Sequence, residues 1–160
     1  MVSANVANVM LDSLFARQVL YTKSGTETNP VYSVAIPLST QCWIGVSTTE
    51  PSLSNGAISG FTEPASSTGY ARSRLGVGGN DATLIMDAAA NSVITNGTNF
   101  IFFDEAVTGG GGFGNVKWFG LFSSKTGGQP LVAGKLTTAV DVNEGNVLIF
   151  RPSNLKISME

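Results

Sequence analysis

Four consecutive glycines, Gly109 to Gly112, form the stretch of this sequence that most resembles a ligand-binding loop. Glycine-rich loops that bind phosphate lead into a helix, whose N-terminus supplies backbone N–H donors and a favourable dipole. In this chain the glycines lead into residues 114–124, whose alternating apolar pattern predicts a strand. Glycine adopts positive φ at no steric cost, which chain reversals require. The run therefore predicts a turn between two strands, with no bound ligand.

The residue types that most often carry catalysis are scarce. The chain has no histidine, which removes the most common general base and metal ligand. Its one cysteine, Cys42, lies in the apolar run QCWIGV and is expected to be a buried thiol rather than a nucleophile. The adjacent acids Asp104 and Glu105 are expected on opposite faces of a strand, so they cannot flank one glycosidic bond. We expect no catalytic or cofactor-binding residues and no enzymatic activity.

Two further patterns favour structure over binding. Asp141, Asn143 and Gly145 have a distant likeness to a calcium loop, but the glycine comes one place early and a proline replaces the bidentate glutamate. A hairpin turn without metal is the expectation. Trp43, Trp118 and Tyr70 could stack on a sugar ring, but aromatic side chains are more often core or interface residues.

Composition predicts one domain with a weakly charged surface. Charged residues make up 12% of the 160 residues, against roughly 25% in ordinary soluble domains. The net charge of −2 gives no long-range attraction to nucleic acid or to anionic membranes. The start has no basic signal-peptide region, since Arg17 is its first positive side chain, and no apolar run reaches the length of a membrane span. We expect neither a nucleic-acid nor a membrane partner.

The chain is expected to divide into three parts. Residues 1–21 predict an N-terminal α-helical arm, residues 22–30 a polar linker and residues 31–160 a β-domain. The helix has an apolar stripe, made by Met10, Leu11, Leu14 and Phe15. A short helix is marginal alone in water, so the stripe must pack on its own domain or on a partner. We expect it to be the partner-binding element.

Residues 31–160 show short alternating segments separated by turn signals, which predicts an all-β fold. The expected architecture is an antiparallel β-sandwich, jelly-roll-like. Residues 48–69 are expected to be a long loop. In the segment 41–47, Cys42, Ile44 and Val46 are expected on one face, and in the strand over 99–106 Ile101 and Phe103 are expected to share a face. In the strand over 114–124, one face is expected to hold Val116, Trp118, Gly120 and Phe122. Gly127-Gly128 is expected to form the next hairpin turn.

The order of several motifs resembles a known family. The helix MLDSLFA is followed by STTEP, a second TEP, GYAR, FFDEA, WFGLFSSKTGG, LVAGKLT, VNEGNVLIF and LKISME. This order resembles small virion proteins of tailed phages, of the tail-fibre-like, head-fibre or capsid-decoration type. The most specific elements are Gly69 to Arg72 and the segment from Phe119 to Gly128. The likeness covers most of the chain from about residue 6.

The resemblance implies a non-enzymatic structural role on the virion after assembly in the host cytoplasm. It implies a homotrimer in contact with other virion proteins of the capsid or the tail. One alternative is a capsid decoration, cement or head-fibre protein. The other is a tail-fibre module that binds a receptor or a glycan, and copy number per particle would separate the two.

Overall fold

The computed structural model describes residues 41–54, 57–77, 86, 90–91 and 93–158. The predicted helix over 1–21, the linker over 22–30 and the domain boundary at residue 31 lie outside these residues. No helix in the described part of the chain has the length and apolar character needed to cross a membrane.

The largest element is a four-stranded antiparallel sheet with the order β4-β1-β7-β8. Its strands are β1 (Gln41–Ser47), β4 (Ser73–Val77), β7 (Gly114–Phe122) and β8 (Val132–Val142). The predicted hairpin at Gly127-Gly128 is confirmed, because β7 and β8 are adjacent and pair antiparallel from Leu121 and Val132 onward.

Three antiparallel pairs complete the described strands. They are β6 (Ile101–Glu105) with β9 (Val147–Phe150), β5 (Val93–Thr95) with β10 (Lys156–Ser158), and β2 (Ser52–Ser54) with β3 (Ala57–Ser59). The all-β, antiparallel prediction is confirmed for the residues that the structure describes. A jelly roll would need two four-stranded sheets, and the described strands form one such sheet and three pairs, so that finer prediction is not confirmed.

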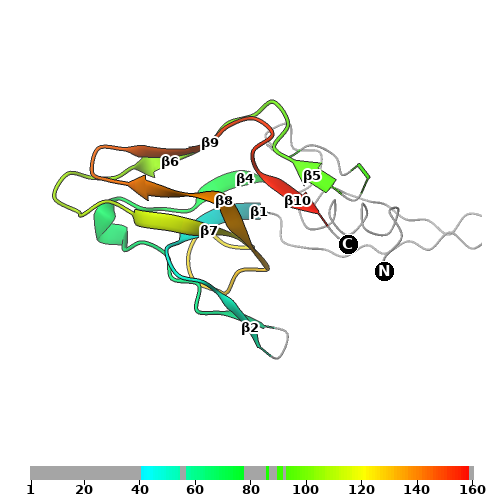
Figure 1. The fold of residues 1–160 in the computed structure, drawn as a ribbon, viewed down its shortest axis with the longest axis horizontal. Coiled ribbons are helices and arrows are strands. Elements are labelled where there is room, and N and C mark those ends of the chain that lie inside the picture. The colour runs from blue at the N-terminus through cyan, green and yellow to red at the C-terminus, as the bar shows by residue number, and fades with distance from the viewer. Residues whose placement is uncertain (1–40, 55–56, 78–85, 87–89, 92, 159–160) are drawn as a thin grey trace, which may run out of the picture.

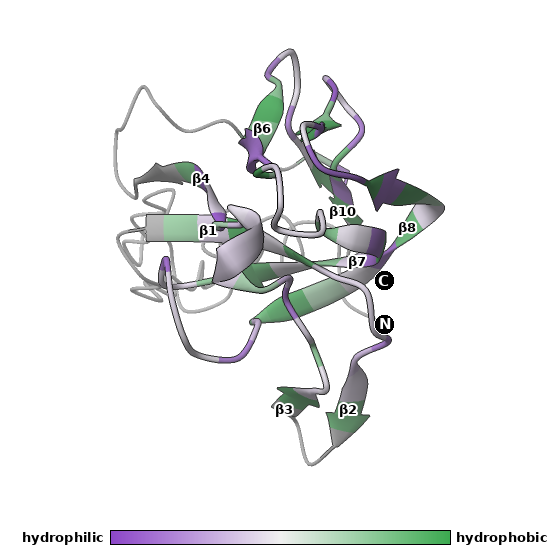
Figure 2. Cartoon of the chain, turned by 90° about the vertical axis from the view of Figure 1, so that its left-hand side faces the viewer, coloured by the Kyte–Doolittle hydropathy of each residue, from purple (hydrophilic) through white to green (hydrophobic). Residues whose placement is uncertain are grey.

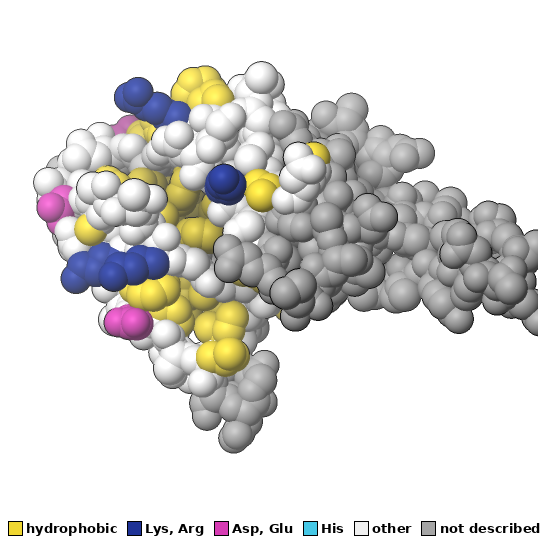
Figure 3. Space-filling model, turned by 45° about the vertical axis from the view of Figure 1, so that its right-hand side comes forward, with side chains coloured by type: hydrophobic (Ala, Val, Ile, Leu, Met, Phe, Trp, Pro, Cys, Tyr) yellow, Lys and Arg dark blue, Asp and Glu magenta, His cyan; other side chains and the backbone are white. Residues whose placement is uncertain are grey.

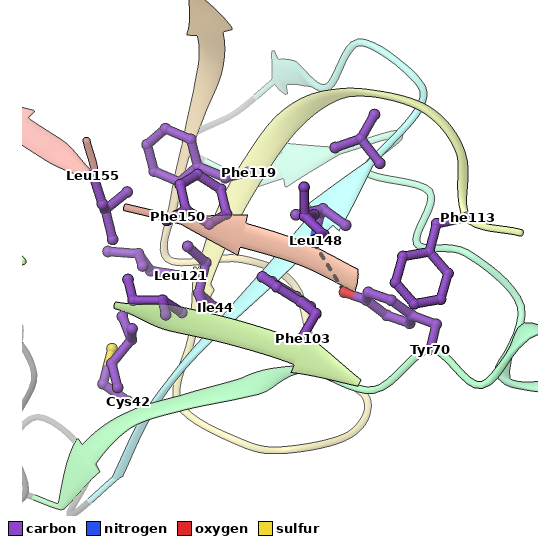
Figure 4. Packing of buried hydrophobic residues seen from close by; sticks show 14 of the residues in the cluster. Cys42, Ile44, Tyr70, Phe103, Phe113, Phe119, Leu121, Leu148, Phe150 and Leu155 are labelled. Carbon is purple, nitrogen blue, oxygen red and sulfur yellow. Dashed lines mark hydrogen bonds between the residues drawn. The ribbon is translucent and has the colours of Figure 1, made fainter. Parts of the chain in front are cut away.

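The β6–β9 pair lies alongside the four-stranded sheet, and the two share one core (Figure 1). Strand alternation supplies this core: Cys42, Ile44 and Val46 are buried on β1, and Ile101 and Phe103 on β6. Figure 4 shows Phe103, Leu148 and Phe150 from the pair facing Ile44 and Leu121 of the sheet. These alternations were predicted from sequence and are confirmed for β1 and β6.

The predicted face of Val116 is wrong. Val116 is fully buried in the same core as Phe119 and Leu121, not on the face of Trp118. The cause is a register shift, because Val116 pairs with Val140 whereas Trp118 pairs with Lys135. Such an irregularity breaks the two-residue side-chain period and turns a side chain to the other face.

Two connections also differ from expectation. The predicted loop over 48–69 contains the β2–β3 hairpin and a 3₁₀ turn, η1 (Ser66–Thr68). This hairpin projects away from the body of the molecule (Figures 1 and 2). Residues 143–146 form a turn, with the Asn146 N–H donating to the Asn143 carbonyl. It is not a hairpin turn, because β9 pairs with β6 rather than with β8.

Candidate functional site

The predicted partner-binding residues, Met10, Leu11, Leu14 and Phe15, lie outside the described residues. Within the described residues, the densest polar cluster surrounds Arg72. We call it the Arg72 cluster; its side chains are Glu63, Tyr70, Arg72 and Phe122.

Arg72 is a buried cation held by the chain's own acceptors. Its Nε donates to Oε1 of Glu63 at 2.8 Å, and its Nη2 donates to Oε2 at 2.6 Å. Its Nη1 donates to the carbonyl oxygens of Ser124 at 2.9 Å and Gly127 at 2.8 Å. Its Cζ lies 3.3 Å from the centre of the Phe122 ring, a cation–π contact. All three guanidinium nitrogens therefore have partners within the protein.

Tyr70 extends the cluster into the core. Its hydroxyl donates to Oε1 of Glu63 at 2.8 Å. It also accepts the backbone N–H of Val46 at 2.9 Å, the dashed bond in Figure 4. Burial raises the pKa of the Tyr70 hydroxyl far above its usual range, and the Glu63 carboxylate raises it further. The hydroxyl therefore stays protonated and remains a donor. Its ring packs edge-on against Phe113 with ring centres 5.4 Å apart.

The local sequence explains how these groups meet. Residues two apart on an extended chain share a side, so Tyr70 and Arg72 both reach Glu63. A side chain at Gly45 of β1 would block this approach, because its Cβ would lie 2.6 Å from Oε1 of Glu63. The segments TEP, GYAR and FGLFSSKTGG, which carried the family resemblance, thus converge on one cluster.

A shallow hollow of about 210 Å³ lies beside the cluster, lined by residues from 63–72 and 125–127. The polar atoms beneath the hollow already form hydrogen bonds within the chain. The Glu63 carboxylate accepts from Tyr70 and Arg72, and Arg72 also donates to the 124–127 turn. The arrangement ties the β7–β8 turn to β1 and β4. Its chemistry is that of a structural clamp.

The structure also places the other groups considered from the sequence. Cys42 is buried, and burial raises the pKa of its thiol to about 12. Asp104 and Glu105 are both exposed on β6. In the described ranges, no set of three or more His, Cys, Asp or Glu side chains could hold a metal ion.

The glycine run is confirmed as a turn that leads into strand β7 rather than into a helix. It also binds a carboxylate of its own chain: the Gly111 N–H donates to Oε1 of Glu144 at 2.8 Å. The backbone N–H groups of Gly109 and Gly111 hold the pKa of Glu144 below its usual value. The turn therefore contacts the 143–146 turn through an anion-binding concavity.

The aromatic residues considered for glycan stacking separate into two groups. Tyr70 belongs to the core, as the alternative interpretation expected. Trp43 and Trp118 are partly buried, each with a lysine ammonium 5.9 Å from its ring. Phe100 and Phe102 were not predicted as surface residues, but they are exposed and stacked on each other with ring centres 5.7 Å apart. The alternation of NFIFFDEA places Phe100 and Phe102 opposite the predicted core face and could have revealed them.

Comparison with known proteins gives the family. No curated protein matches the chain. The family model described as podophage GP4 fiber I protein gp80 matches residues 28–158, which include every described strand. The expected resemblance to tailed-phage virion proteins is confirmed at this level. The chain belongs to the podophage GP4 fiber I protein gp80 family and is a structural protein of the bacteriophage virion.

Proposed function

We propose that this protein is a non-enzymatic fibre subunit of the phage virion, assembled as a homotrimer. The observation that carries the proposal is the match of residues 28–158 to a fibre protein family. That name favours the fibre alternatives over a capsid cement. The absence of histidine from the sequence and the burial of Cys42 support a non-enzymatic role.

Location on the particle is tested on purified virions. Mass spectrometry with labelled standards would count this protein against the major capsid protein. Gold-labelled antibodies would show in electron micrographs where it lies. Labelling of projections supports a fibre, with hundreds of copies for head fibres and few for tail fibres. Even labelling of the capsid shell without projections would contradict the proposal.

The N-terminal helix over residues 1–21 is the proposed attachment element, with the β-domain, jelly-roll-like, facing outward. Burying the four apolar side chains of its stripe against another virion protein is worth roughly 6–12 kcal/mol at most, before ordering costs. Several copies seated together would add to this by avidity.

Deletion of residues 1–21 tests the attachment role. The truncated protein should keep its melting temperature and lose its place on the virion. Leu14→Asp should have the same effect, whereas Asp12→Ser, off the predicted stripe, should not. Normal incorporation of the truncated protein would refute attachment through this helix. Failure of the truncated protein to fold would show that the stripe is part of the domain core.

A further inference from the structure

The outward side of the β6–β9 pair is apolar. The exposed fractions are 57% for Phe102, 48% for Phe100, 43% for Ile149 and 42% for Val147. Phe102 and Ile149 are directly paired across the two strands, and Val147 pairs with Glu105 farther along. We call these four side chains the β6–β9 outer face.

The inward side of the same pair is already buried. Ile101, Phe103, Leu148 and Phe150 lie in the core. A two-stranded antiparallel pair that covers a core on one side normally presents polar residues on the other. Apolar residues on both sides are typical of strands that are covered on both. The outer face therefore has the composition of a surface that receives a partner.

The size of the outer face fits the centre of a protein interface. A large aromatic side chain buries about 150–250 Å² when covered, so the four half-exposed side chains present on the order of 350 Å². A standard interface covers about 800 Å² per partner, of which somewhat more than half is apolar. The face would supply most of that apolar part. Interface centres are rich in aromatic residues, as this face is. The charged Glu105, which pairs with Val147, lies at the end of the face away from Phe100, where the polar rim of an interface is expected.

The arrangement of side chains favours another copy of this chain as the partner. The β6 side of the face carries an aromatic row, Phe100 and Phe102, and the β9 side carries a smaller aliphatic row, Val147 and Ile149. Rotation about an axis along the strands brings the aromatic row of one copy against the aliphatic row of the next, and the contact closes into a ring. A glycan would require hydrogen-bonding groups among the rings, and none of these four side chains has one.

We propose that the β6–β9 outer face is the surface through which copies of this chain associate around a three-fold axis, the aromatic row of each copy against the aliphatic row of the next. The inference rests on the proposed homo-oligomer and assigns its contact surface. Figure 3 shows one side of the molecule, where the described surface has only a few isolated charged side chains, in keeping with the 12% charged residues of the chain. Association through the β6–β9 outer face is driven by apolar burial, so it should persist at high salt.

The test uses the full chain and light scattering. The wild type should have the mass of three chains, and Phe102→Arg should fall about threefold to the 16.6 kDa of one chain. Phe102→Arg should fold, because the side chain it replaces is more than half exposed. The matched control is Leu53→Arg, because Leu53 is 75% exposed on the projecting β2–β3 hairpin and its substitution should leave the oligomer intact. If Phe102→Arg fails to fold, Ile149→Ser provides the same comparison.

An engineered thiol supplies a second measurement. Cys42 is the only native cysteine and is buried, so Phe102→Cys places a single accessible thiol on the outer face. A bis-maleimide should link Phe102→Cys chains to each other and leave Leu53→Cys chains unlinked. A monomeric wild type would refute the oligomer itself. An oligomeric wild type whose Phe102→Arg variant keeps its mass, with no crosslinking at position 102, would overturn only the assignment of the surface.

Discussion

Arg72 and Glu63 form a two-pronged ion pair, with Nε to Oε1 at 2.8 Å and Nη2 to Oε2 at 2.6 Å. The guanidinium is almost fully covered, and the Glu63 side chain is 25% exposed. The pair joins the segment before β4 to the turn after β7, because Arg72 also holds the carbonyls of that turn. A planar ion pair joined by two hydrogen bonds depends on the geometry of the guanidinium group as well as on its charge.

Arg72→Ala should destabilise the domain strongly, because it removes the cation that pairs with Glu63 and the guanidinium donor of two carbonyls, and leaves Glu63 with only the Tyr70 hydroxyl among the donors of the cluster. Breaking a buried ion pair costs about 3–5 kcal/mol, and the partial exposure of Glu63 places this case toward the lower end. Arg72→Lys keeps the positive charge but loses the two-pronged hydrogen bonding of the guanidinium, so it should lower the free energy of unfolding by an intermediate amount. Urea unfolding followed by tryptophan fluorescence gives the values. A loss below about 1 kcal/mol for Arg72→Ala would contradict the clamp.

Tyr70→Phe should keep the ring packing and lose the hydroxyl that bridges Val46 and Glu63. A buried N–H left unsatisfied costs about 1–3 kcal/mol, and Tyr70→Ala should cost more because it also opens a cavity. The raised pKa means that the hydroxyl stabilises the fold fully below its unfolded value of about 10 and less as pH rises above it. Unfolding at pH 7 and 11 checks both points: the gap between wild type and Tyr70→Phe should narrow at pH 11.

Glu144→Gln should make the stability of the fold less dependent on pH under acidic conditions. The folded pKa of Glu144 lies below its usual value of about 4.5, so its contribution is present above that pH and is lost as pH falls through the lowered pKa. Melting temperatures between pH 2.5 and 6 should decline less steeply for Glu144→Gln than for the wild type. Identical pH profiles would show that the carboxylate does not hold the glycine turn in solution.

Cys42 should react with thiol reagents only when the domain unfolds. Burial and a pKa of about 12 leave almost no accessible thiolate at pH 8. In the native protein, the rate of thiol labelling should follow the rate of the unfolding that exposes Cys42. Urea should raise the labelling rate to that of a free thiol. Labelling of the native protein within seconds would contradict the buried position.

Alanine at Gly110 or Gly111 should destabilise the turn for two different reasons. Gly111 has φ of 88°, where a side chain costs roughly 1–2 kcal/mol. At Gly110 a Cβ would lie 2.9 Å from the Ser67 carbonyl oxygen, so the backbone must move. The neighbouring Thr108→Ala is the control and should have little effect. Calorimetry with ATP or GTP should show no binding by the wild type, and micromolar affinity would contradict a purely structural turn.

Local features of this protein were predictable from its amino-acid sequence. Side chains alternate with a period of two in any extended strand, so the buried faces of β1 and β6 and the core position of Cys42 followed from composition and spacing alone. The turns at the glycine run and at Gly127-Gly128 followed in the same way, because glycine tolerates a backbone that other residues avoid.

Features that join distant segments of the chain depended on the folded structure. The alternation of a strand says which residues share a face, but the strand's partner and register depend on hydrogen bonds to distant segments. The register shift beside Val116 and the pairing of β9 with β6 are of this kind. So is the meeting of Arg72 with carbonyls 52 and 55 residues away, because a buried cation goes where folding brings acceptors together.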